Sequence, residues 1–429
     1  MEEQFLIIFN IIFDILKNWW WIIAPFILIK PFLFIYLWWR NEVWLKKIKM
    51  ILLEIKPPKD VLRPLRAMET VFSALWHFYD PPNSREKWFE GKLQLSISLE
   101  IASLGGEPHF FIRLPINLRN LVESVLYAQY PDIEIEEVND YTKYVPQDIP
   151  NKDWKMWGCD YELLKNDVYP IKTYSSFFEE RPDIAEEEKR IDPISLLLEG
   201  MSKFKTGEQL WLQIIAKPVA AGIDSDYVER GKKEVDKLVK RPKPTVSKPM
   251  IQETIEMMIS GDSPSVKEKN VELIPPEMQL TPGERDVVSA VENKASKYAF
   301  KCNIRFIQLG KKDVFFSPNK VIPMGFFDQF STTNLNGMKP SKKTITKIHT
   351  IWLWFLDEKR TYLRKRNIFN NYIKRVNPFF PFDGGTFILN VEELASLYHF
   401  PGRGVTAAPS ISRVEAKRGE APSGLPINE

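Results

Sequence analysis

The sequence predicts an α+β protein with an N-terminal transmembrane helix, ferredoxin-like (split β-α-β) sandwich units after it, and a long helix near the C-terminus. Three observations support this prediction. The first forty residues contain a long apolar run rich in tryptophan. The following part alternates apolar and polar side chains over short stretches that are separated by helical patterns. Residues 345–372 have helical spacing throughout.

The apolar run extends from Trp19 to Trp39. As a helix it would be about 32 Å long, which matches the hydrocarbon core of a bilayer. Aromatic rings prefer the headgroup level, and tryptophans gather at both ends of the run. The predicted membrane anchor residues are Trp19, Trp20, Trp21, Trp38 and Trp39.

The number of membrane passes stays open at this stage. Lys30 lies near the middle of the run, where a charge costs roughly 2.5 to 3.5 kcal/mol on insertion scales. An earlier frame, residues 5–29, takes in Asp14 and Lys17 instead. Pro25 and Pro31 would kink a spanning helix, so a re-entrant hairpin is the alternative.

The charges beside the run predict its orientation. Eight Lys or Arg residues lie between Arg40 and Arg66, against only Lys17 before Trp19. The positive-inside bias therefore places the bulk of the chain in the cytoplasm, at the inner (cytoplasmic) membrane. Glu2 and Glu3 replace the basic start of a signal peptide, so the anchor is expected to stay uncleaved.

Length and composition indicate a folded protein with two or three domains. The chain has 429 residues, 44% of them hydrophobic, and a net charge of only +3, so any basic surface must be local. Cys159 and Cys302 are far apart, which argues against a disulfide framework and a cysteine-rich zinc site. The predicted division is 1–56 anchor and juxtamembrane helix, 60–230 ferredoxin-like domain or domains, 231–283 Pro/Lys-rich linker, 284–400 second α+β domain, and 401–429 flexible tail.

Periodicity places the elements of the soluble part. Strands are predicted over residues 93–101, 109–115, 132–138, 169–174, 209–219 and 301–310. Helices are predicted over residues 44–55, 65–79, 117–127, 194–204, 284–299 and 345–372. Gly105 and Gly106 make the turn of the first hairpin. The order helix, strand, strand, helix, strand favours the split β-α-β arrangement.

Motifs for catalysis are absent from the sequence. It has no G-x-x-x-x-G-K-[ST] phosphate loop and no G-x-S-x-G elbow. The four histidines, His77, His109, His349 and His399, do not have the spacing that puts two metal ligands on one helix face. The sequence therefore predicts a non-enzymatic protein without catalytic residues, cofactor or metal.

A local basic segment runs from Lys339 to Arg375. It has eleven Lys or Arg residues against Asp357 and Glu358, with aromatic residues between them. Such a segment suits single-stranded nucleic acid or anionic lipid, and the alternative is a packed helix with its aromatic side chains in the core. The candidate contacts are Arg360, Arg364, Lys365 and Arg366.

Several stretches resemble a known family. They are LLEIKPP, RAMETVFSALW, SLEIASLGGEPHFFIRLP, SVLYAQYPDIEIEEV, YPIKTY, GEQLWLQIIAKP, FILNVEELASLYHFPG and APSGLP, between about Leu52 and Pro426. They resemble the membrane-anchored N-terminal region, a domain of unknown function, of bacterial type IV secretion or conjugation coupling proteins and HerA-like ATPases. The ATPase core of those proteins does not follow here, so the resemblance implies a separate ATPase partner.

The resemblance implies an accessory role in DNA transfer. The chain would be a non-enzymatic membrane-anchored subunit that docks a separately encoded P-loop translocase ATPase, with the lipid bilayer as a second partner. Homo-oligomerisation and direct DNA binding are left open. The residues expected to lie next to the ATPase are Leu394, Tyr398, His399 and Pro401, unless they only complete the last core. The alternatives are a single-stranded nucleic-acid-binding module at the cytoplasmic face and a lipid-surface scaffold.

Overall fold

The computed structural model describes residues 2–57, 65–177, 192–239, 280–348, 354–379 and 384–402. Within the first helix, side chains are described for Lys17 and from Pro25 onward. Predictions that fall on other parts of the chain, including the middle of the 231–283 linker and the 401–429 tail after residue 402, lie outside the described residues.

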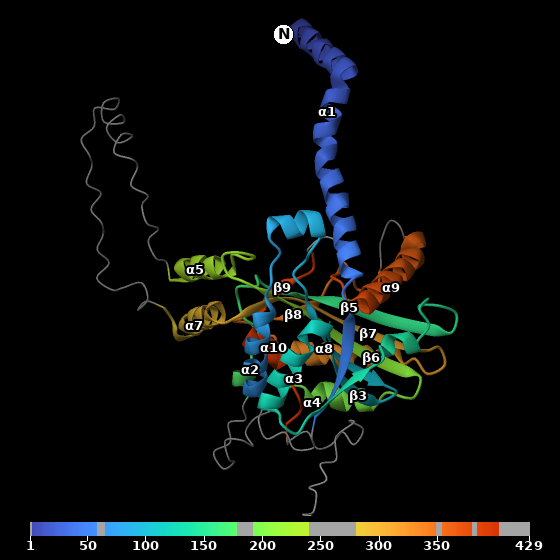
Figure 1. Cartoon of the computed structure of the whole chain (residues 1–429), viewed down its shortest axis with the longest axis vertical. Helices are drawn as coiled ribbons and strands as arrows, with labels where there is room; N and C mark the ends of the chain where they lie inside the picture. The colour runs from blue at the N-terminus through green and yellow to red at the C-terminus, as the bar shows by residue number, and fades with distance from the viewer. Residues whose placement is uncertain are drawn as a thin grey trace, which may run out of the picture.

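The described strands form one antiparallel sheet (Figure 1). Its order is β4-β1-β3-β2-β6-β7-β5-β8, with β9 paired to β7. The strands are β1 (Met50–Lys56), β2 (Ile97–Leu104), β3 (Glu107–Pro115), β4 (Glu134–Val138), β5 (Trp154–Leu163), β6 (Glu208–Val219), β7 (Ala299–Lys311), β8 (Met338–Pro340) and β9 (Phe387–Asn390).

Helices cover both faces of this sheet. The described helices are α1 (Glu2–Leu45), α2 (Leu65–Leu75), α3 (Arg119–Gln129), α4 (Ser195–Ser202), α5 (Tyr227–Leu238), α7 (Pro282–Ser296), α8 (Val321–Asp328), α9 (Asp357–Lys374) and α10 (Val391–Leu397), of which α1 stands away from the sheet. Apolar side chains of α2, α3, α4, α8 and α10 pack on one face. The opposite face packs against α9 and the residues before β5. The central strands are therefore buried on both faces.

The α+β class is confirmed. The β2–β3 hairpin turns at Gly105 and Gly106, whose φ angles of 69° and 100° suit glycine in a tight turn. Strands β6 and β7 and helices α4 and α7 also occupy the predicted positions. Separate ferredoxin-like units are not found in the described chain, because β6 pairs with both β2 and β7 and joins the two halves in one sheet.

The predicted N-terminal transmembrane helix is wrong. Across the described part of the chain, no helix is both long enough and apolar enough to cross a membrane. Charge is the physical reason, because the described side chains from Pro25 to Leu45 include Lys30, Arg40 and Glu42. The side chains of Trp19, Trp20 and Trp21 lie outside the described residues.

Three further predictions of secondary structure need correction, one of them the strand over residues 169–174, where the structure has no strand. Residues 50–56, predicted to end a juxtamembrane helix, form β1, because Ile51, Leu53 and Ile55 fill the core on one side of the sheet while the backbone pairs with β3 and β4. The long C-terminal helix begins at Asp357, later than predicted, and residues 349–353 before it are not described.

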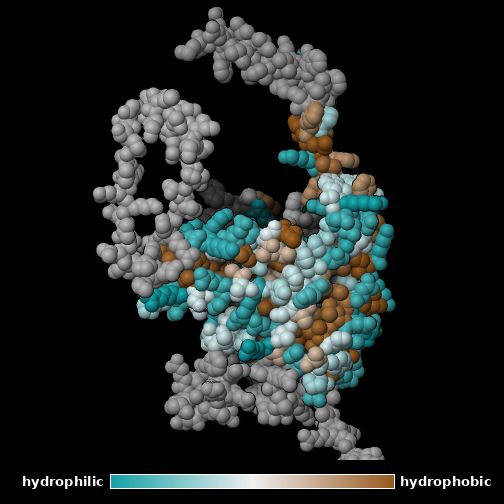
Figure 2. Space-filling model, turned by 60° about the vertical axis from the view of Figure 1, so that its left-hand side comes forward, coloured by the Kyte–Doolittle hydropathy of each residue, from teal (hydrophilic) through white to brown (hydrophobic). Residues whose placement is uncertain are grey.

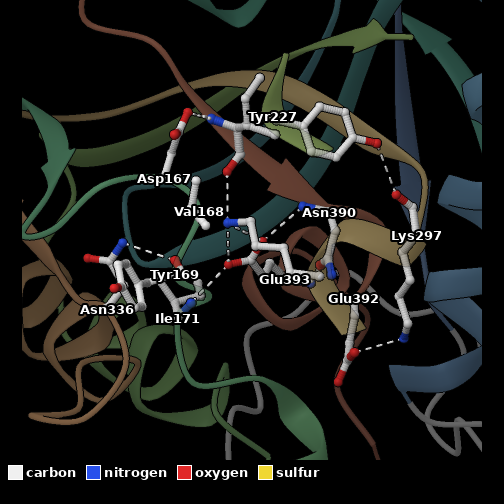
Figure 3. A network of polar contacts seen from close by, with 12 residues as sticks. Asp167, Val168, Tyr169, Ile171, Tyr227, Lys297, Asn336, Asn390, Glu392 and Glu393 are labelled. Carbon is white, nitrogen blue, oxygen red and sulfur yellow. Dashed lines mark hydrogen bonds and ion pairs between the residues drawn. The ribbon is translucent and has the colours of Figure 1, made fainter. Parts of the chain in front are cut away.

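A buried ion pair holds helix α10 against helix α7 (Figure 3). Lys294 of α7 contacts the Glu393 carboxylate at 2.9 Å and donates to the carbonyl of Ile388 at 3.0 Å. The same carboxylate accepts the backbone N–H of Asn390 and of Ile171, each at 2.9 Å. Burial raises the pKa of Glu393, and the charge of Lys294 opposes that shift. The pair joins α7, β9 and α10 to the segment before α4.

We predict that Glu393→Gln destabilises the protein by about 3 kcal/mol, because Lys294 would keep a buried charge without its counter-ion. Glu392→Gln is the matched control, since Glu392 pairs with the half-exposed Lys297 and should cost about 1 kcal/mol or less. Urea denaturation followed by fluorescence measures both. Equal costs for the two variants would contradict the assignment.

Candidate functional site

A row of polar side chains crosses the sheet face that α9 covers. The register of neighbouring strands places them side by side. The row comprises Arg113, Ser98, Glu100, Gln213, Arg305 and Asp160. All except Arg113 are buried, so their charges must be satisfied within the protein.

Arg375, at the end of α9, covers this row of polar side chains. It caps the C-terminus of α9 with φ 54° and ψ 50°, a left-handed conformation that is uncommon for residues other than glycine. Its guanidinium donates to Glu100 at 2.9 and 3.2 Å and also to Asp140 at 2.9 Å. Burial alone would raise the pKa of Glu100, yet the charge and hydrogen bonds of Arg375 lower it. We call these three residues the Arg375 cluster.

The carboxylate of Glu100 is saturated with donors. Besides Arg375, it accepts the hydroxyls of Tyr141 and Ser98, each at 2.7 Å, and the amide of Gln213 at 3.0 Å. A carboxylate engaged in this way is held in its ionised form and has little capacity left to accept a proton from a substrate. The geometry therefore indicates a structural role for Glu100.

A cleft of about 310 Å³ opens beside the Arg375 cluster. Its walls come from the end of α1, residues 93–98, the start of β1, strands β3, β6 and β7, and the C-terminus of α9. Among the described residues, five cationic side chains and no carboxylate line it: Arg113, Lys217, Lys301, Lys374 and Arg375. Lys217 and Lys301 are direct cross-strand partners. We call this the basic cleft.

Arg113 gives the basic cleft its electrostatic character. Within the described chain its guanidinium makes no hydrogen bond, although the side chain is half-buried. Burial lowers the pKa of Arg113, and the nearby charge of Arg375 lowers it further, against the opposing effect of Glu100 and Asp140. A cation in such surroundings is stabilised by an anion. The cleft is therefore suited to anion binding rather than to proton transfer.

Comparison with known proteins identifies the family. Residues 52–318 match the model described as a domain of unknown function, DUF8128. The chain belongs to the DUF8128 family. The match begins in β1 and extends past β7, so it includes Glu100, Arg113, Lys217 and Lys301, whereas α1 and Arg375 lie outside it. No curated protein matches the chain. The DUF8128 match confirms the resemblance to a domain of unknown function, and the secretion role stays a proposal.

The predicted basic contacts of α9 lie away from the cleft. Arg364 donates to two backbone carbonyls of the segment after β8, at 3.1 and 3.3 Å. Arg366 donates to the carbonyls of Gln147 and Ile149. Arg360 and Lys365 are half-buried. The arginines thus tie α9 to the DUF8128 domain and its neighbouring segments, and their contact with nucleic acid or lipid stays a prediction.

The residues predicted to contact an ATPase are all buried. Leu394 and Tyr398 are in the core beneath α2, and Pro401 is buried after them. His399 bonds Asp192 at 2.8 Å through Nε2. Burial alone would raise the pKa of Asp192, but the charge of His399 lowers it. These four side chains contact the chain itself, and the ATPase contact stays a prediction.

Helix α1 stands away from the DUF8128 domain (Figure 1). Nine large apolar side chains on it are 39–74% exposed, and Figure 2 shows this apolar surface in brown: Phe26, Ile27, Leu28, Ile29, Phe32, Phe34, Ile35, Trp38 and Trp39. The root of α1 is held by Tyr36, which donates to the carbonyl of Trp88 at 3.1 Å. Gly91 lies against the Arg40 backbone, where a Cβ atom would come within 2.4 Å of the carbonyl.

Sequence analysis missed the basic cleft. Arg113, Lys217, Lys301 and Lys374 belong to different elements that only the sheet register and the end of α9 bring together. A local signal did exist, because Glu100, Gln213 and Arg305 interrupt strands whose neighbours are apolar. A charged residue in a strand buried on both faces needs a buried partner.

We predict that Glu100→Gln lowers the free energy of unfolding at pH 7 by about 3 kcal/mol, because the buried Arg375 would lose half of its counter-charge. The control is Glu199→Gln, whose exposed pair with Lys203 is worth less than about 0.5 kcal/mol. A Glu100→Gln protein as stable as the control would contradict a stabilising ion pair.

The same cluster predicts the response to acid. The folded-state pKa values of Glu100 and Asp140 are lowered, so their contribution is complete above the unfolded-state pKa of about 4 and is lost as pH falls through the folded values. Urea denaturation between pH 7 and pH 3 should therefore show a steep loss of stability below about pH 4. Glu100→Gln should make that loss shallower. An unchanged slope in Glu100→Gln would exclude Glu100 as a source of the acid sensitivity.

Proposed function

We propose that this protein is a non-enzymatic accessory subunit of a type IV secretion- or conjugation-like DNA-transfer machine. The DUF8128 domain serves as a platform, α1 attaches it to the bilayer surface, and a separately encoded P-loop translocase ATPase docks on it. The observation that carries the proposal is the uncovered apolar surface of α1. The sequence resemblance supplies the class of machine and the ATPase partner.

The exposed apolar residues of α1 need a covering partner. Phe26, Ile27, Leu28 and Ile29 are consecutive and all exposed, so they point to every side of the helix. Exposed apolar side chains are stabilised when a partner covers them, although Lys30 follows directly and interrupts this surface. An apolar medium around α1 removes that exposure.

Lipid is the medium that the neighbouring residues favour. Trp38 and Trp39 end the apolar stretch, Arg40 follows directly, and Lys46 and Lys47 come one to two turns later, with Glu42 between them. Tryptophan prefers the headgroup level, and basic side chains next to it are attracted to anionic headgroups by about 1 kcal/mol each. This order of apolar, aromatic and basic residues supports attachment at a membrane surface.

Helix α9 places further exposed aromatic residues on the side of the molecule from which α1 projects. Its C-terminus lines the basic cleft with Asn41 of α1, and Figure 1 shows the helix slanting outward beside the root of α1. Trp354 and Phe355 precede the helix and are exposed, as are Tyr362 and Leu363 within it. Exposed aromatic residues beside an apolar helix support the same lipid-facing surface.

We predict that Ile27→Glu/Ile35→Glu lowers the fraction of protein that floats with phosphatidylcholine vesicles at least tenfold, because two charges would enter the apolar surface of α1. The matched control is Ile223→Glu/Val321→Glu, since those side chains are 74% and 59% exposed on the body. The control should float like the natural protein. Equal flotation of the two double variants would exclude α1 as the attachment element.

The partner is tested separately. We predict that the tagged full-length protein, solubilised in detergent from its native host, recovers a P-loop translocase in stoichiometric amount, identified by mass spectrometry. The Ile27→Glu/Ile35→Glu protein should recover the same translocase, because the docking platform is the folded body. Recovery of only lipid and the chain itself would contradict the ATPase-docking role and leave a lipid-surface scaffold.

A further inference from the structure

The basic cleft lies at the root of α1, and the proposed DNA-transfer role does not use it. Its cationic side chains come from three strands and the end of α9, so the folded sheet sets their separation. Arg375 is held by Glu100 and Asp140, and Lys217 and Lys301 keep contacts within the chain. Arg113 and Lys374 form no hydrogen bond or ion pair in the described chain.

We propose that the basic cleft is a binding site for a phosphate ester with an apolar substituent, with Arg113 and Lys374 as its principal phosphate contacts. Arginine presents several donors in a planar fork that matches phosphate oxygens, and a lysine adds a point charge. In the part of the chain that the structure describes, no carboxylate lines the cleft to compete with such an anion. This assignment is independent of the DNA-transfer proposal.

The other walls of the cleft define the rest of the ligand. Its apolar side is formed by Leu45, Ile48, Met50, Leu93, Leu95 and Ile215. A volume of about 310 Å³ is at the lower end of small-molecule sites and exceeds what a bare phosphate fills. The ligand therefore has an anionic and an apolar part, as in a phospholipid, whose phosphate lies near the first carbons of its acyl chains, and in a free alkyl phosphate.

The position of the cleft bears on the source of the ligand. Asn41 lines the cleft two residues after Trp39, so the site opens where the apolar stretch of α1 ends. A phospholipid phosphate can therefore enter the cleft with the first carbons of its acyl chains, while the rest of these chains stays beside α1. A free organophosphate would enter from solvent and would need no bilayer.

The test uses the full-length protein with two kinds of probe. Hexyl phosphate, a phosphate ester with an apolar substituent, is titrated against the detergent-solubilised protein by calorimetry. Flotation then compares phosphatidylcholine vesicles with vesicles that also contain phosphatidic acid. The cleft variant is Arg113→Gln/Lys374→Gln, and the charge-matched control is Lys203→Gln/Lys233→Gln, whose side chains are 70% and 71% exposed.

We expect the cleft variant to bind at least tenfold more weakly than the control. If the cleft variant loses the hexyl phosphate binding that the control keeps, the ligand is accepted free in solution. If only the preference for phosphatidic acid is lost, the ligand is a headgroup. Binding to neither probe by the natural protein, or equal binding by the cleft variant and the control, would overturn the proposal.

Two further variants keep these outcomes distinct. Lys374→Gln alone removes an exposed side chain and keeps the fold, and it should weaken binding at least threefold even if the double variant unfolds. Ile27→Glu/Ile35→Glu should lose flotation on both kinds of vesicle and retain hexyl phosphate binding. Failure of the α1 attachment is thereby separated from failure of the phosphate site.

Discussion

The ion pair of Arg375 with Glu100 and Asp140 is the interaction on which the rest of the structure depends. It joins α9, near the end of the described chain, to β2 and to the residues that follow β4. A buried arginine is costly unless its hydrogen bonds are made, and here the two carboxylates accept them while the Tyr141 and Ser98 hydroxyls complete Glu100. The left-handed backbone of Arg375 ends α9 directly above this point.

The position at which α9 ends also determines the shape of the basic cleft, which lies on the side of the molecule to which we assign the function. Because the helix stops above the polar row, Lys374 and Arg375 line a cleft with the end of α1 and with Arg113. The root of α1 is fixed in turn by Tyr36 and by the close approach of Gly91. One rigid arrangement thus places an apolar helix, exposed aromatic residues and a basic cleft together, as attachment to a lipid surface requires.

The sequence predicted what local patterns determine. Alternation identified β2, β3, β6 and β7, and the two glycines of the hairpin marked their turn. Contacts between residues that are distant in the sequence determine the elements that the sequence did not predict. Residues 50–56 became a strand because β3 and β4 flank them, and residues 169–174 did not, because the Ile171 N–H is taken by Glu393. The basic cleft could not be predicted, since its cations are distant in sequence and meet only through the register of the sheet.

The central claim, that lipid covers α1, is tested most directly by labelling its apolar surface. Cys159 and Cys302 are buried, so a fluorescent thiol reagent goes to a cysteine introduced by Ile35→Cys, or by Ile223→Cys on the body. Quenching by a water-soluble reductant is then followed with vesicles present. The account predicts quenching at least tenfold slower at position 35 than at position 223. Equal rates at the two positions would contradict it.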